Sequence, residues 1–277
     1  MARSSTQFKE KCGPWALIAG GSEGIGGAYA SALAERGLNI ALVARRPELL
    51  ESKATELERQ FGIETRTIEL DLASPQLMDV VSEKTQDIEI GFLVYNAGLA
   101  SVGAFFDSTI EDELARLDIN CRGPLSLTYH LGRKMIERKR GGIILMSSGA
   151  GLRGSPYYSH YAATKAYNIV LAESLWYEFK PYSVDVLACI AGMTSSPGLK
   201  GSMDEKGMAK GAYVMTPEQV VSEALRALGK QPSIITGKPN QRTMLLLGSM
   251  PRKKAVAEMG KHAIKNFLGG KRPPQFQ

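Results

Sequence analysis

The chain has 277 residues, 44% of them hydrophobic and 22% charged, and this balance excludes a disordered chain, a collagen-like repeat and a long coiled coil. Such a length can bury one large core, so we expect a single domain over residues 1–277. From Gln241 onward, eight Lys and Arg residues stand against Glu258 alone, so this tail has a net charge of +7 and the rest of the chain about −1, which together give the net charge of +6. A nucleic-acid-binding protein would spread its positive charge over a docking face, and we expect no nucleic-acid partner.

The three cysteines, Cys12, Cys121 and Cys189, are far apart and form no C-x-x-C pair. This pattern argues against a disulfide framework and against a zinc site, so we expect no bound metal and a reducing compartment. The first 15 residues lack the apolar core of a signal peptide, and the sequence has no run of 18 apolar residues. These features predict a cytoplasmic protein without an integral membrane segment.

Short apolar or β-branched runs alternate with longer segments of helical period, a pattern typical of parallel strands joined by crossover helices. The expected strands are 15–19, 39–44, 64–69, 91–95, 142–147, 183–190 and 233–236. Helices are expected to begin near Gly24, Glu48, Pro75, Ile110, His160 and Pro217. Pro75 and Pro217 suit a first helical position, because that position leaves its N–H unpaired and proline has none. The sequence therefore predicts an α/β fold with seven parallel strands and helices on both faces of the sheet.

Two segments fall outside this alternation. Residues 194–213 are rich in Gly, Ser, Met and Lys without a clean period, so we expect a lid there. Four methionines in and beside it either line an apolar pocket or pack the lid: Met193, Met203, Met208 and Met215. Residues 241–277 form the basic tail, which is predicted to contain an amphipathic helix from apolar residues at helical spacing: Val256, Met259, Ala263 and Phe267. The core of the domain then spans about residues 12–240.

A glycine-rich turn links the first strand to the first helix of the alternation. Backbone N–H groups at such a helix start attract a pyrophosphate through their unpaired donors and the helix dipole, and glycines permit its close approach. A tight turn that serves only packing would look similar. We expect this turn to bind a dinucleotide through Gly20, Ser22, Gly24, Ile25 and Gly26.

Arg45 and Arg46 follow the second strand, where a fold selective for NAD usually carries an acid against the adenosine ribose. The planar guanidinium of arginine can pair with a 2′-phosphate instead. The alternative is that both arginines are solvated at the start of a helix. The absence of an acid at this place in the sequence predicts NADP(H) as the cofactor.

Taken together, these motifs resemble the short-chain dehydrogenase/reductase family over roughly residues 12–240. The glycine turn is similar to the cofactor motif of that family, and further matches follow in chain order: Asp71-Leu72, Asn96-Ala97-Gly98, Asn120, Ser148 and Tyr161-x-x-x-Lys165. The resemblance implies a doubly wound fold of the Rossmann type in which Asp71, Leu72 and residues 96–98 bind the cofactor. It also implies that Gly192 and Thr194, after the sixth strand, lie at its nicotinamide end. Glu23 departs from the family, in which many NADP(H) enzymes have a basic residue in this turn.

Tyr161 and Lys165 are four residues apart and therefore share one face of a helix. A free phenol has a pKa of about 10, and we expect the neighbouring ammonium and the positive nicotinamide ring to lower the pKa of Tyr161. The resemblance implies that Tyr161 is the general acid for reduction and the general base for oxidation. It implies that Lys165 holds the nicotinamide ribose, Ser148 the substrate oxygen and Asn120 a proton path.

Each of these roles has a structural alternative. Ser148 is otherwise a capping or turn serine, and Asn120 a helix asparagine that bonds to neighbouring backbone. Asp71 either contacts the adenine or caps its own loop. His160 adjoins the tyrosine but points about 100° away from it on a helix, so we expect it to take no part in the reaction.

The sequence as a whole predicts an NADP(H)-dependent oxidoreductase that interconverts a ketone and a secondary alcohol. The segments 12–15 and 36–40 are similar to a branch that reduces long-chain 3-ketoacyl thioesters or steroid ketones, which favours an apolar substrate. The alternative is a non-catalytic nucleotide-sensing or scaffold protein on the same fold, and the complete Ser-Tyr-Lys set argues against it. The resemblance also implies a homodimer or homotetramer built on the helices that begin near Ile110 and His160. The basic tail is a solvated face, a subunit contact or a peripheral contact with an anionic surface such as phospholipid.

Overall fold

The computed structural model describes residues 5–196 and 213–271. Seven parallel strands form one sheet in the order β3-β2-β1-β4-β5-β6-β7. The strands are β1 (Trp15–Ala19), β2 (Asn39–Ala44), β3 (Thr65–Glu69), β4 (Ile90–Tyr95), β5 (Gly141–Ser148), β6 (Val184–Ala191) and β7 (Ser233–Ile235). The predicted seven-stranded Rossmann-type sheet is therefore confirmed, with each strand end within one residue of its expected place.

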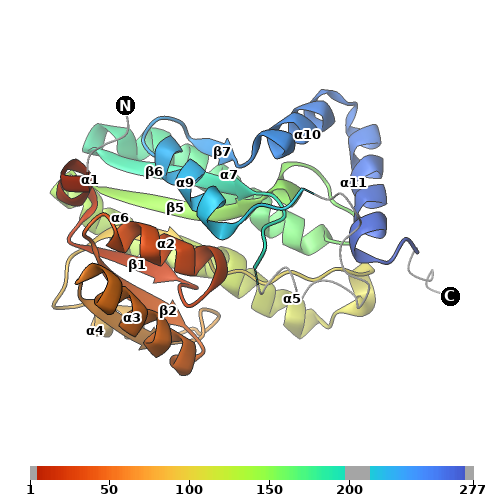
Figure 1. Ribbon diagram of the computed structural model, residues 1–277. Coiled ribbons are helices and arrows are strands. Elements are labelled where there is room, and N and C mark those ends of the chain that lie inside the picture. Colours follow the sequence, from red (N-terminus) through yellow and green to blue (C-terminus); the bar gives the residue numbers. More distant parts are fainter. Residues whose placement is uncertain (1–4, 197–212, 272–277) are drawn as a thin grey trace.

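Helices cover both faces of the sheet (Figure 1). One face is packed by α1 (Ser5–Cys12), α2 (Gly24–Ala34), α3 (Pro47–Phe61) and α9 (Pro217–Ala227). The other is packed by α4 (Leu77–Lys84), α6 (Gly123–Arg138) and α7 (Ser159–Phe179). The central strands are apolar on both sides, and all five residues of β1 are buried, as expected for parallel strands with helices on both faces.

The order of the strands predicts a crevice at the edge of the sheet where the carboxyl ends of β1 and β4 lie. The chain builds outward from β1 through β2 to β3 and then crosses over to β4 on the other side of β1. At this reversal the loops that leave the carboxyl ends of β1 and β4 diverge to opposite faces. Open α/β sheets bind ligands in the crevice that results.

One expectation about the helices was wrong, and one expected helix has an irregular continuation. Pro75 is not the first residue of a helix, because α4 begins at Leu77 after a turn in which the Leu77 N–H donates to the carbonyl of Ser74 at 3.2 Å. Pro217 does begin α9, behind a capping box formed by Thr216 and Gln219. The helix that begins at Ile110 is not continuous: α5 (Ile110–Leu117) passes through a π-turn, Asp118–Arg122, into α6.

After β7 the chain forms two further helices, α10 (Lys238–Ser249) and α11 (Arg252–Phe267), at one end of the molecule (Figure 1). The predicted amphipathic tail helix is confirmed by α11, whose inner side buries Ala255, Gly260 and Ala263. Most of the expected lid, residues 197–212, lies outside the described residues. Over residues 5–196 and 213–271, no helix combines the length and the apolar character needed to cross a membrane.

Candidate active site

The glycine turn after β1 forms a tightly packed cradle at the N-terminus of α2. Gly20 has φ +78° and its α-carbon approaches the next loop so closely that a Cβ there would lie 2.9 Å from the Ala97 nitrogen. A Cβ on Gly26 would lie 1.9 Å from the Gly20 carbonyl oxygen. Glu23 is the N-cap of α2, and its side chain makes no capping hydrogen bond to the first N–H groups of the helix. These features fit the phosphates of a dinucleotide.

The loop after β4 closes the other side of this cradle. The backbone N–H groups of Asn96 and Ala97 both donate to the Ala19 carbonyl at 2.9 Å, and the Asn96 side-chain amide donates to the Gly20 carbonyl at 2.9 Å. The two loops therefore hold each other at the carboxyl ends of β1 and β4. A Cβ on Gly98, the last residue of the predicted motif, would lie 3.0 Å from Lys165 Nζ. The Asn-Ala-Gly loop thus connects the glycine turn with α7.

The two arginines after β2 differ in their surroundings. Arg45 and Arg46 are both exposed, and Arg46 forms an ion pair with Glu23 of the glycine turn. The unexpected acid in this turn is therefore the partner of an arginine that was expected to meet a phosphate. Arg45 lies on the same exposed edge without that ion pair, which makes it the better placed of the two for an external anion.

Asp71 and Leu72 lie beyond β3. The Asp71 carboxylate accepts a hydrogen bond from the Ala73 N–H at 2.9 Å, which is the loop-capping geometry, and Leu72 is buried. After β6, Thr194 Oγ1 donates to the Gly192 carbonyl at 3.1 Å, and its backbone pairs with Met215 in an isolated bridge. Met215 is buried in the core, so at least this methionine packs the protein interior.

The serine, tyrosine and lysine expected to carry the chemistry are brought together between β5 and α7. Ser148, the last residue of β5, accepts a hydrogen bond from the Ala150 N–H at 3.3 Å and also hydrogen-bonds with the Tyr161 phenol. Lys165 is buried, donates to the Met146 carbonyl at 3.2 Å, and its Nζ lies 5.7 Å from the centre of the Tyr161 ring. Ser147 instead turns toward α7, where it donates to the Lys165 carbonyl at 2.8 Å.

The ionisation of this pair is governed mainly by burial. Burial raises the pKa of Tyr161, and the hydrogen bond with Ser148 lowers it by less. Burial also lowers the pKa of Lys165 to about 8. In the protein alone the pKa of the phenol is therefore raised rather than lowered, because removal from water disfavours both charged forms. The expected lowering also involved the positive nicotinamide ring. A cationic ring placed beside the phenol would oppose the effect of burial on Tyr161.

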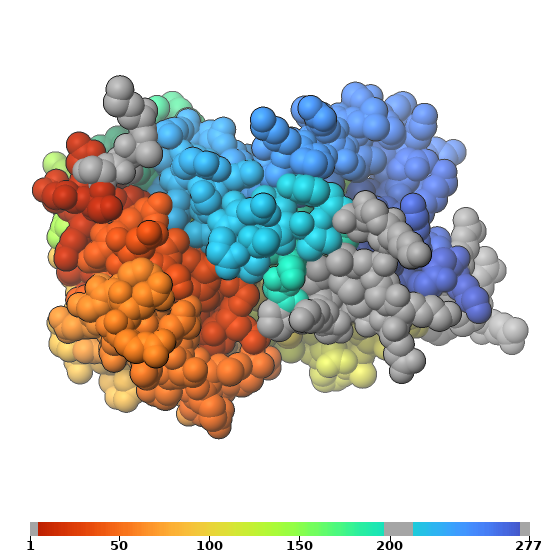
Figure 2. Space-filling view, in the orientation of Figure 1, coloured from red at the N-terminus to blue at the C-terminus, as the bar shows by residue number. Residues whose placement is uncertain are grey.

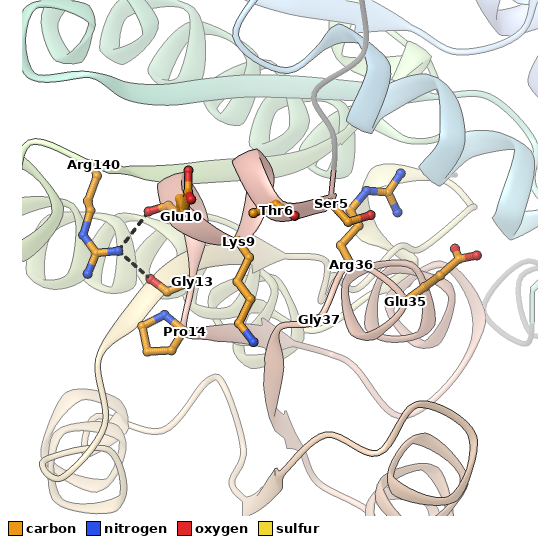
Figure 3. A pocket seen from close by; sticks show the side chains of 10 residues that line it. All are labelled: Ser5, Thr6, Lys9, Glu10, Gly13, Pro14, Glu35, Arg36, Gly37 and Arg140. Atoms are coloured by element: carbon orange, nitrogen blue, oxygen red, sulfur yellow. Dashed lines mark hydrogen bonds between the residues drawn. The ribbon is translucent and has the colours of Figure 1, made fainter.

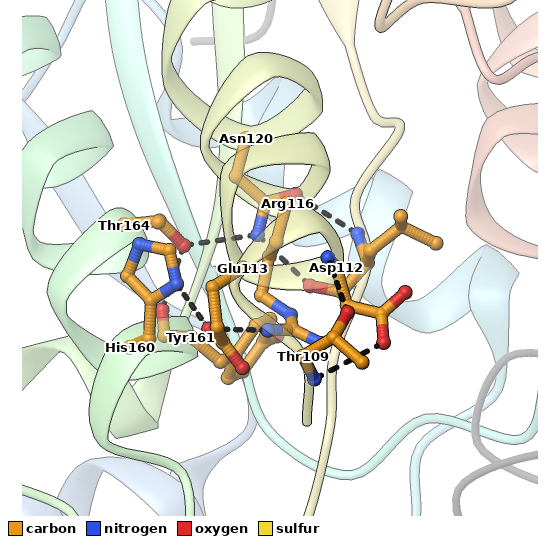
Figure 4. A network of polar contacts seen from close by, with 9 residues as sticks. Thr109, Asp112, Glu113, Arg116, Asn120, His160, Tyr161 and Thr164 are labelled. Atoms are coloured by element: carbon orange, nitrogen blue, oxygen red, sulfur yellow. Dashed lines mark hydrogen bonds and ion pairs between the residues drawn. The ribbon is translucent and has the colours of Figure 1, made fainter. Parts of the chain in front are cut away.

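Asn120 lies in the π-turn and is fully buried. Its side-chain amide donates to the Leu99 carbonyl and to Thr164 Oγ1, both at 2.9 Å, and its Oδ1 accepts from the Leu99 N–H at 2.9 Å (Figure 4). The side chain thus ties the loop after β4 to α7. All of these partners belong to distant segments, so Asn120 is not the helix asparagine bonded to neighbouring backbone that was the structural alternative.

A buried ionic cluster on the same side of α7 was not predicted. Glu113 on α5 pairs with Arg116 one turn later, which is 5% exposed, and with His160 Nδ1 (Figure 4). Burial alone would raise the pKa of Glu113, but the hydrogen bonds with Arg116 and His160 outweigh it and lower that pKa. His160 takes no part in the Ser-Tyr-Lys set, yet it fixes the first turn of α7 next to Tyr161. An acid with a base three residues on and a histidine in a distant segment gave no distinctive sequence signal.

The C-terminal helices form one wall of the site, which the sequence did not reveal. The end of the Met244 side chain would lie 3.0 Å from a Cβ on Gly149, next to Ser148, and the Asn240 amide would lie 2.3 Å from a Cβ on Gly192. Phe267 of α11 stacks edge-on against Tyr158, with ring centres 5.3 Å apart. The tail therefore packs against the carboxyl ends of β5 and β6.

A second hollow of about 520 Å³ lies at the opposite edge of the sheet (Figure 3). It is lined by residues before β1 and β2, including Pro14 and Gly37, and by Arg140, whose guanidinium donates to the carbonyls of Glu10 and Gly13. These residues lie at the amino ends of the strands, away from the Ser-Tyr-Lys set. The cluster at the carboxyl ends, rather than this hollow, combines the features of a reaction site.

The doubly wound sheet, the glycine cradle and the Ser-Tyr-Lys set define a dinucleotide-dependent oxidoreductase. The chain belongs to the short chain dehydrogenase family, whose sequence profile matches residues 14–207. A 7beta-hydroxysteroid dehydrogenase of Mediterraneibacter gnavus is 32% identical over 86% of this chain and 91% of that protein. The family expected from the sequence is thus confirmed, and so is its branch, since 17-beta-hydroxysteroid dehydrogenases and a 3-oxoacyl-CoA reductase-like protein are also relatives.

Two solved structures extend the comparison. The structure of a 7beta-hydroxysteroid dehydrogenase studied for its stereoselectivity has a TM-score of 0.85 and 30% sequence identity, and the match covers 91% of this chain and 98% of that one. A short-chain dehydrogenase from Sphingobium yanoikuyae in complex with NADPH has a TM-score of 0.74 and 26% identity, over 86% and 97% of the two chains. The similarity to both includes almost the whole of the compared proteins.

Proposed function

We propose that this protein is an NADP(H)-dependent oxidoreductase that interconverts an apolar ketone, of hydroxysteroid type, with the secondary alcohol. The observation that carries the proposal is the cluster of Ser148, Tyr161 and Lys165 at the carboxyl end of β5, facing the crevice beside the glycine cradle. A 3-oxoacyl thioester is the second candidate substrate. A purely nucleotide-sensing protein would have no use for a buried phenol with a lysine one turn away.

The bound cofactor supplies or accepts the hydride. In reduction Tyr161 donates its phenolic proton to the substrate oxygen, while the Ser148 hydroxyl hydrogen-bonds to the same oxygen and orients it. Lys165 holds the nicotinamide ribose and, as an ammonium, favours the phenolate that remains on Tyr161. Asn120 keeps the loop after β4 and α7 at a fixed separation, so that the proton donor and the cofactor cradle stay aligned.

Two features support NADP(H) rather than NAD(H). No acidic residue occupies the end of β2, and Arg45 is exposed there. The related dehydrogenase in complex with NADPH has the same fold. In this proposal Arg45 pairs with the 2′-phosphate, and Arg46 contributes less because Glu23 already holds it. Asp71 and Leu72 border the adenine, and Gly192 and Thr194 border the nicotinamide.

The wall built by the C-terminal helices supports an apolar substrate. Met244 reaches the backbone beside Ser148, and a flexible thioether adapts to an extended apolar surface. The relatives named as hydroxysteroid dehydrogenases act on steroid alcohols, which are rigid and apolar. In this proposal the chain works as one dinucleotide-binding domain.

The protein also fits a homodimer or homotetramer. The expected contact helices begin near Ile110 and His160. The helix α6, which follows α5 after the π-turn, and the helix α7 carry exposed apolar side chains, namely Leu125, Tyr129, Val170 and Tyr177. Trp176 is half-buried against Lys180 and contributes less to that face. Light scattering of the purified protein measures its mass in solution, and a monomer at micromolar concentration would contradict this assembly.

Turnover of NADPH with a panel of steroid ketones and 3-oxoacyl thioesters, followed at the nicotinamide absorbance band, tests the activity. Tyr161→Phe removes only the phenolic oxygen, and we expect kcat to fall by about 100-fold or more because the general acid is lost. NADPH affinity, measured by fluorescence, should stay close to that of the unmodified protein. Tyr182→Phe, 42% exposed just beyond the end of α7, is the matched control and should leave kcat unchanged. Full turnover by Tyr161→Phe would exclude the proposed mechanism.

A further inference from the structure

The outer face of α10 combines exposed leucines with cations. Leu245 and Leu246 are 72% and 60% exposed, which is unusual for adjacent leucines in a helix. Lys238 and Arg242 are also exposed. They precede Leu246 by eight and four residues, so all four side chains project from one side of the helix. We call these four residues the leucine–cation face.

The opposite side of α10 makes the contacts that hold this helix against the rest of the protein. Asn240 donates to the Thr236 carbonyl at 2.8 Å, Met244 reaches Gly149, and Leu247 is buried. These three residues follow one another at spacings of four and three, which places them opposite the leucine–cation face. The inner side of α10 therefore makes the contacts that hold the helix on the sheet, and the two exposed leucines are not needed for that packing.

More cations follow at the start of α11. Arg252, Lys253 and Lys254 are all exposed. The single acid of residues 241–277, Glu258, pairs with Lys261 at 2.7 Å, farther along that helix. Figure 2 shows the C-terminal helices, in blue, on the outer surface of one end of the molecule. Most of the positive charge of residues 241–277 thus lies on α10 and α11, the helix that carries the exposed leucines and the one that follows it.

We propose that the leucine–cation face, with residues 252–254, docks on the surface of a membrane that contains anionic phospholipid. Leucines on the apolar side of an interfacial helix enter the boundary between headgroups and acyl chains, while lysine and arginine meet the phosphates. Each cation near such a surface strengthens binding about fivefold. The leucine–cation face is therefore complementary to a surface on which phosphate charges lie above an apolar layer.

A second copy of the chain would fit the leucine–cation face less well than it would fit the exposed surface of α5. On α5, Ile110 and Leu114 are 64% and 54% exposed, but Glu111 and Asp112 lie beside them. An anionic surface would repel that acidic surrounding, whereas a protein surface need not. The leucine–cation face has the opposite charge, and two copies that met through it would bring their cations together.

Docking in this orientation brings the candidate active site close to the bilayer. The inner side of α10 touches Gly149, next to Ser148, and its outer side is the docking face. One helix thickness then separates the membrane surface from the crevice. An apolar ketone dissolved in the bilayer would reach the site over a short path, a consequence that rests on the proposed function.

Co-sedimentation of the full-length protein with vesicles tests the docking without any substrate, so its outcome is independent of the proposed activity. Vesicles of phosphatidylcholine with 30 mol% phosphatidylserine, roughly the composition of an anionic leaflet, are compared with vesicles of phosphatidylcholine alone. We expect binding to the anionic vesicles only, and its loss at high salt. Equal binding to both kinds of vesicle, or binding to neither, would overturn the proposal.

Two variants assign the binding to this face. Leu245→Ser/Leu246→Ser should weaken binding at least about tenfold, and Arg252→Gln/Lys253→Gln/Lys254→Gln about a hundredfold. The matched control, Lys134→Gln/Arg226→Gln/Lys230→Gln, removes the same charge from exposed positions on other elements and should bind as the unmodified protein does. Equal losses in the control would show that net charge alone drives binding and would refute the docking face. A fall in molecular mass of the leucine variant, measured by light scattering, together with unchanged vesicle binding, would identify a subunit contact instead.

Discussion

The Lys165 ammonium lies 5.7 Å from the centre of the Tyr161 ring and is held by the Met146 carbonyl rather than by the phenol. Burial raises the pKa of Tyr161 and lowers the pKa of Lys165 to about 8. Without the cofactor, Tyr161 is therefore a neutral phenol, and Lys165 is a cation whose burial lowers the stability of the fold. A proton donor for reduction is ready in this state, whereas the base for oxidation needs the help of a cationic partner.

Replacement of Lys165 by methionine should stabilise the fold while it abolishes activity. A pKa lowered from 10.5 to about 8 corresponds to about 3 kcal/mol of unfavourable burial of the charge, and loss of the bond to Met146 offsets roughly 1 kcal/mol of the gain. Urea unfolding at pH 7 should show Lys165→Met to be more stable by about 2 kcal/mol. Because the folded pKa is depressed, this penalty is complete below about pH 8 and is relieved as pH rises toward 10.5.

The difference between Lys165→Met and the unmodified protein should consequently shrink between pH 8 and pH 10. Lys134→Met, at an exposed position on α6, controls for loss of a charge and should show no such pH dependence. A stability difference that stays constant over this range would mean that Lys165 is not buried as a cation.

Cofactor preference should depend on Arg45 more than on Arg46. Loss of a charge-assisted bond to the 2′-phosphate should raise the KM for NADPH roughly 10- to 100-fold in Arg45→Ala, with the KM for NADH unchanged. Arg46→Ala should have a smaller effect because Glu23 already binds this guanidinium. Glu23→Gln frees Arg46 and should lower the KM for NADPH. Steady-state kinetics with both cofactors distinguish these outcomes, and equal effects of the two alanine variants would contradict the assignment.

Asn120 should matter for stability as well as for turnover. Asn120→Ala leaves the Leu99 N–H and carbonyl without their partners and should lower the free energy of unfolding by about 2–3 kcal/mol. Thr164→Val removes only the hydroxyl that accepts from the Asn120 amide, and we expect a loss of about 1 kcal/mol. Urea denaturation of the two variants gives this order directly. An Asn120→Ala protein as stable as the unmodified one would show that water replaces these bonds.

The cluster of Glu113, Arg116 and His160 should contribute to stability in a pH-dependent way. Glu113→Gln leaves the buried Arg116 charge without a counter-ion and should destabilise the protein by about 3 kcal/mol at pH 7. Because the pKa of Glu113 is lowered on folding, its contribution is complete above about pH 4.5 and is lost as pH falls through the lower folded value.

Acid unfolding curves measure this effect, since the gap between Glu113→Gln and the unmodified protein should close below pH 4.5. Glu137→Gln is the matched control: its partner Arg133 is exposed, and the loss should be under about 0.5 kcal/mol. If the two glutamine variants were equally stable, Arg116 would have to be solvated rather than buried.

The fold was predictable from the sequence because hydrophobic period and glycine position carry it. The strands are short apolar runs between helical segments, and Gly20 and Gly26 sit where only a residue without a side chain can pass. The reaction site followed from spacing, since Ser148, Tyr161 and Lys165 lie at the end of one strand and on one face of one helix. The prediction that Pro75 is the first residue of a helix failed because a proline just before a helix and a proline in its first turn have the same sequence neighbours.

The rest depended on contacts between distant segments. The ion pair between Glu23 and Arg46 joins two loops, and neither residue alone predicts it. The wall formed by Met244 and Asn240 depends on how α10 folds back over β5 and β6. The effect of burial on Tyr161 likewise needs the three-dimensional environment, because spacing gives the neighbour of a group but not its exposure to water.

The π-turn between α5 and α6 makes the length of the chain critical at one point. A wide turn holds an extra residue, so it rotates everything that follows by about 100° relative to a regular helix. Two carbonyls of this turn accept hydrogen bonds from side chains of other elements. The Ile119 carbonyl accepts from the Tyr95 hydroxyl at 2.7 Å, and the Asn120 carbonyl accepts from the Asn168 amide at 2.9 Å. Deletion of a single residue between 118 and 122 would rotate the buried side of α6 away from the sheet and leave the Tyr95 hydroxyl and the Asn168 amide without their acceptors. Insertions and deletions should therefore be tolerated in the surrounding loops but not in this turn.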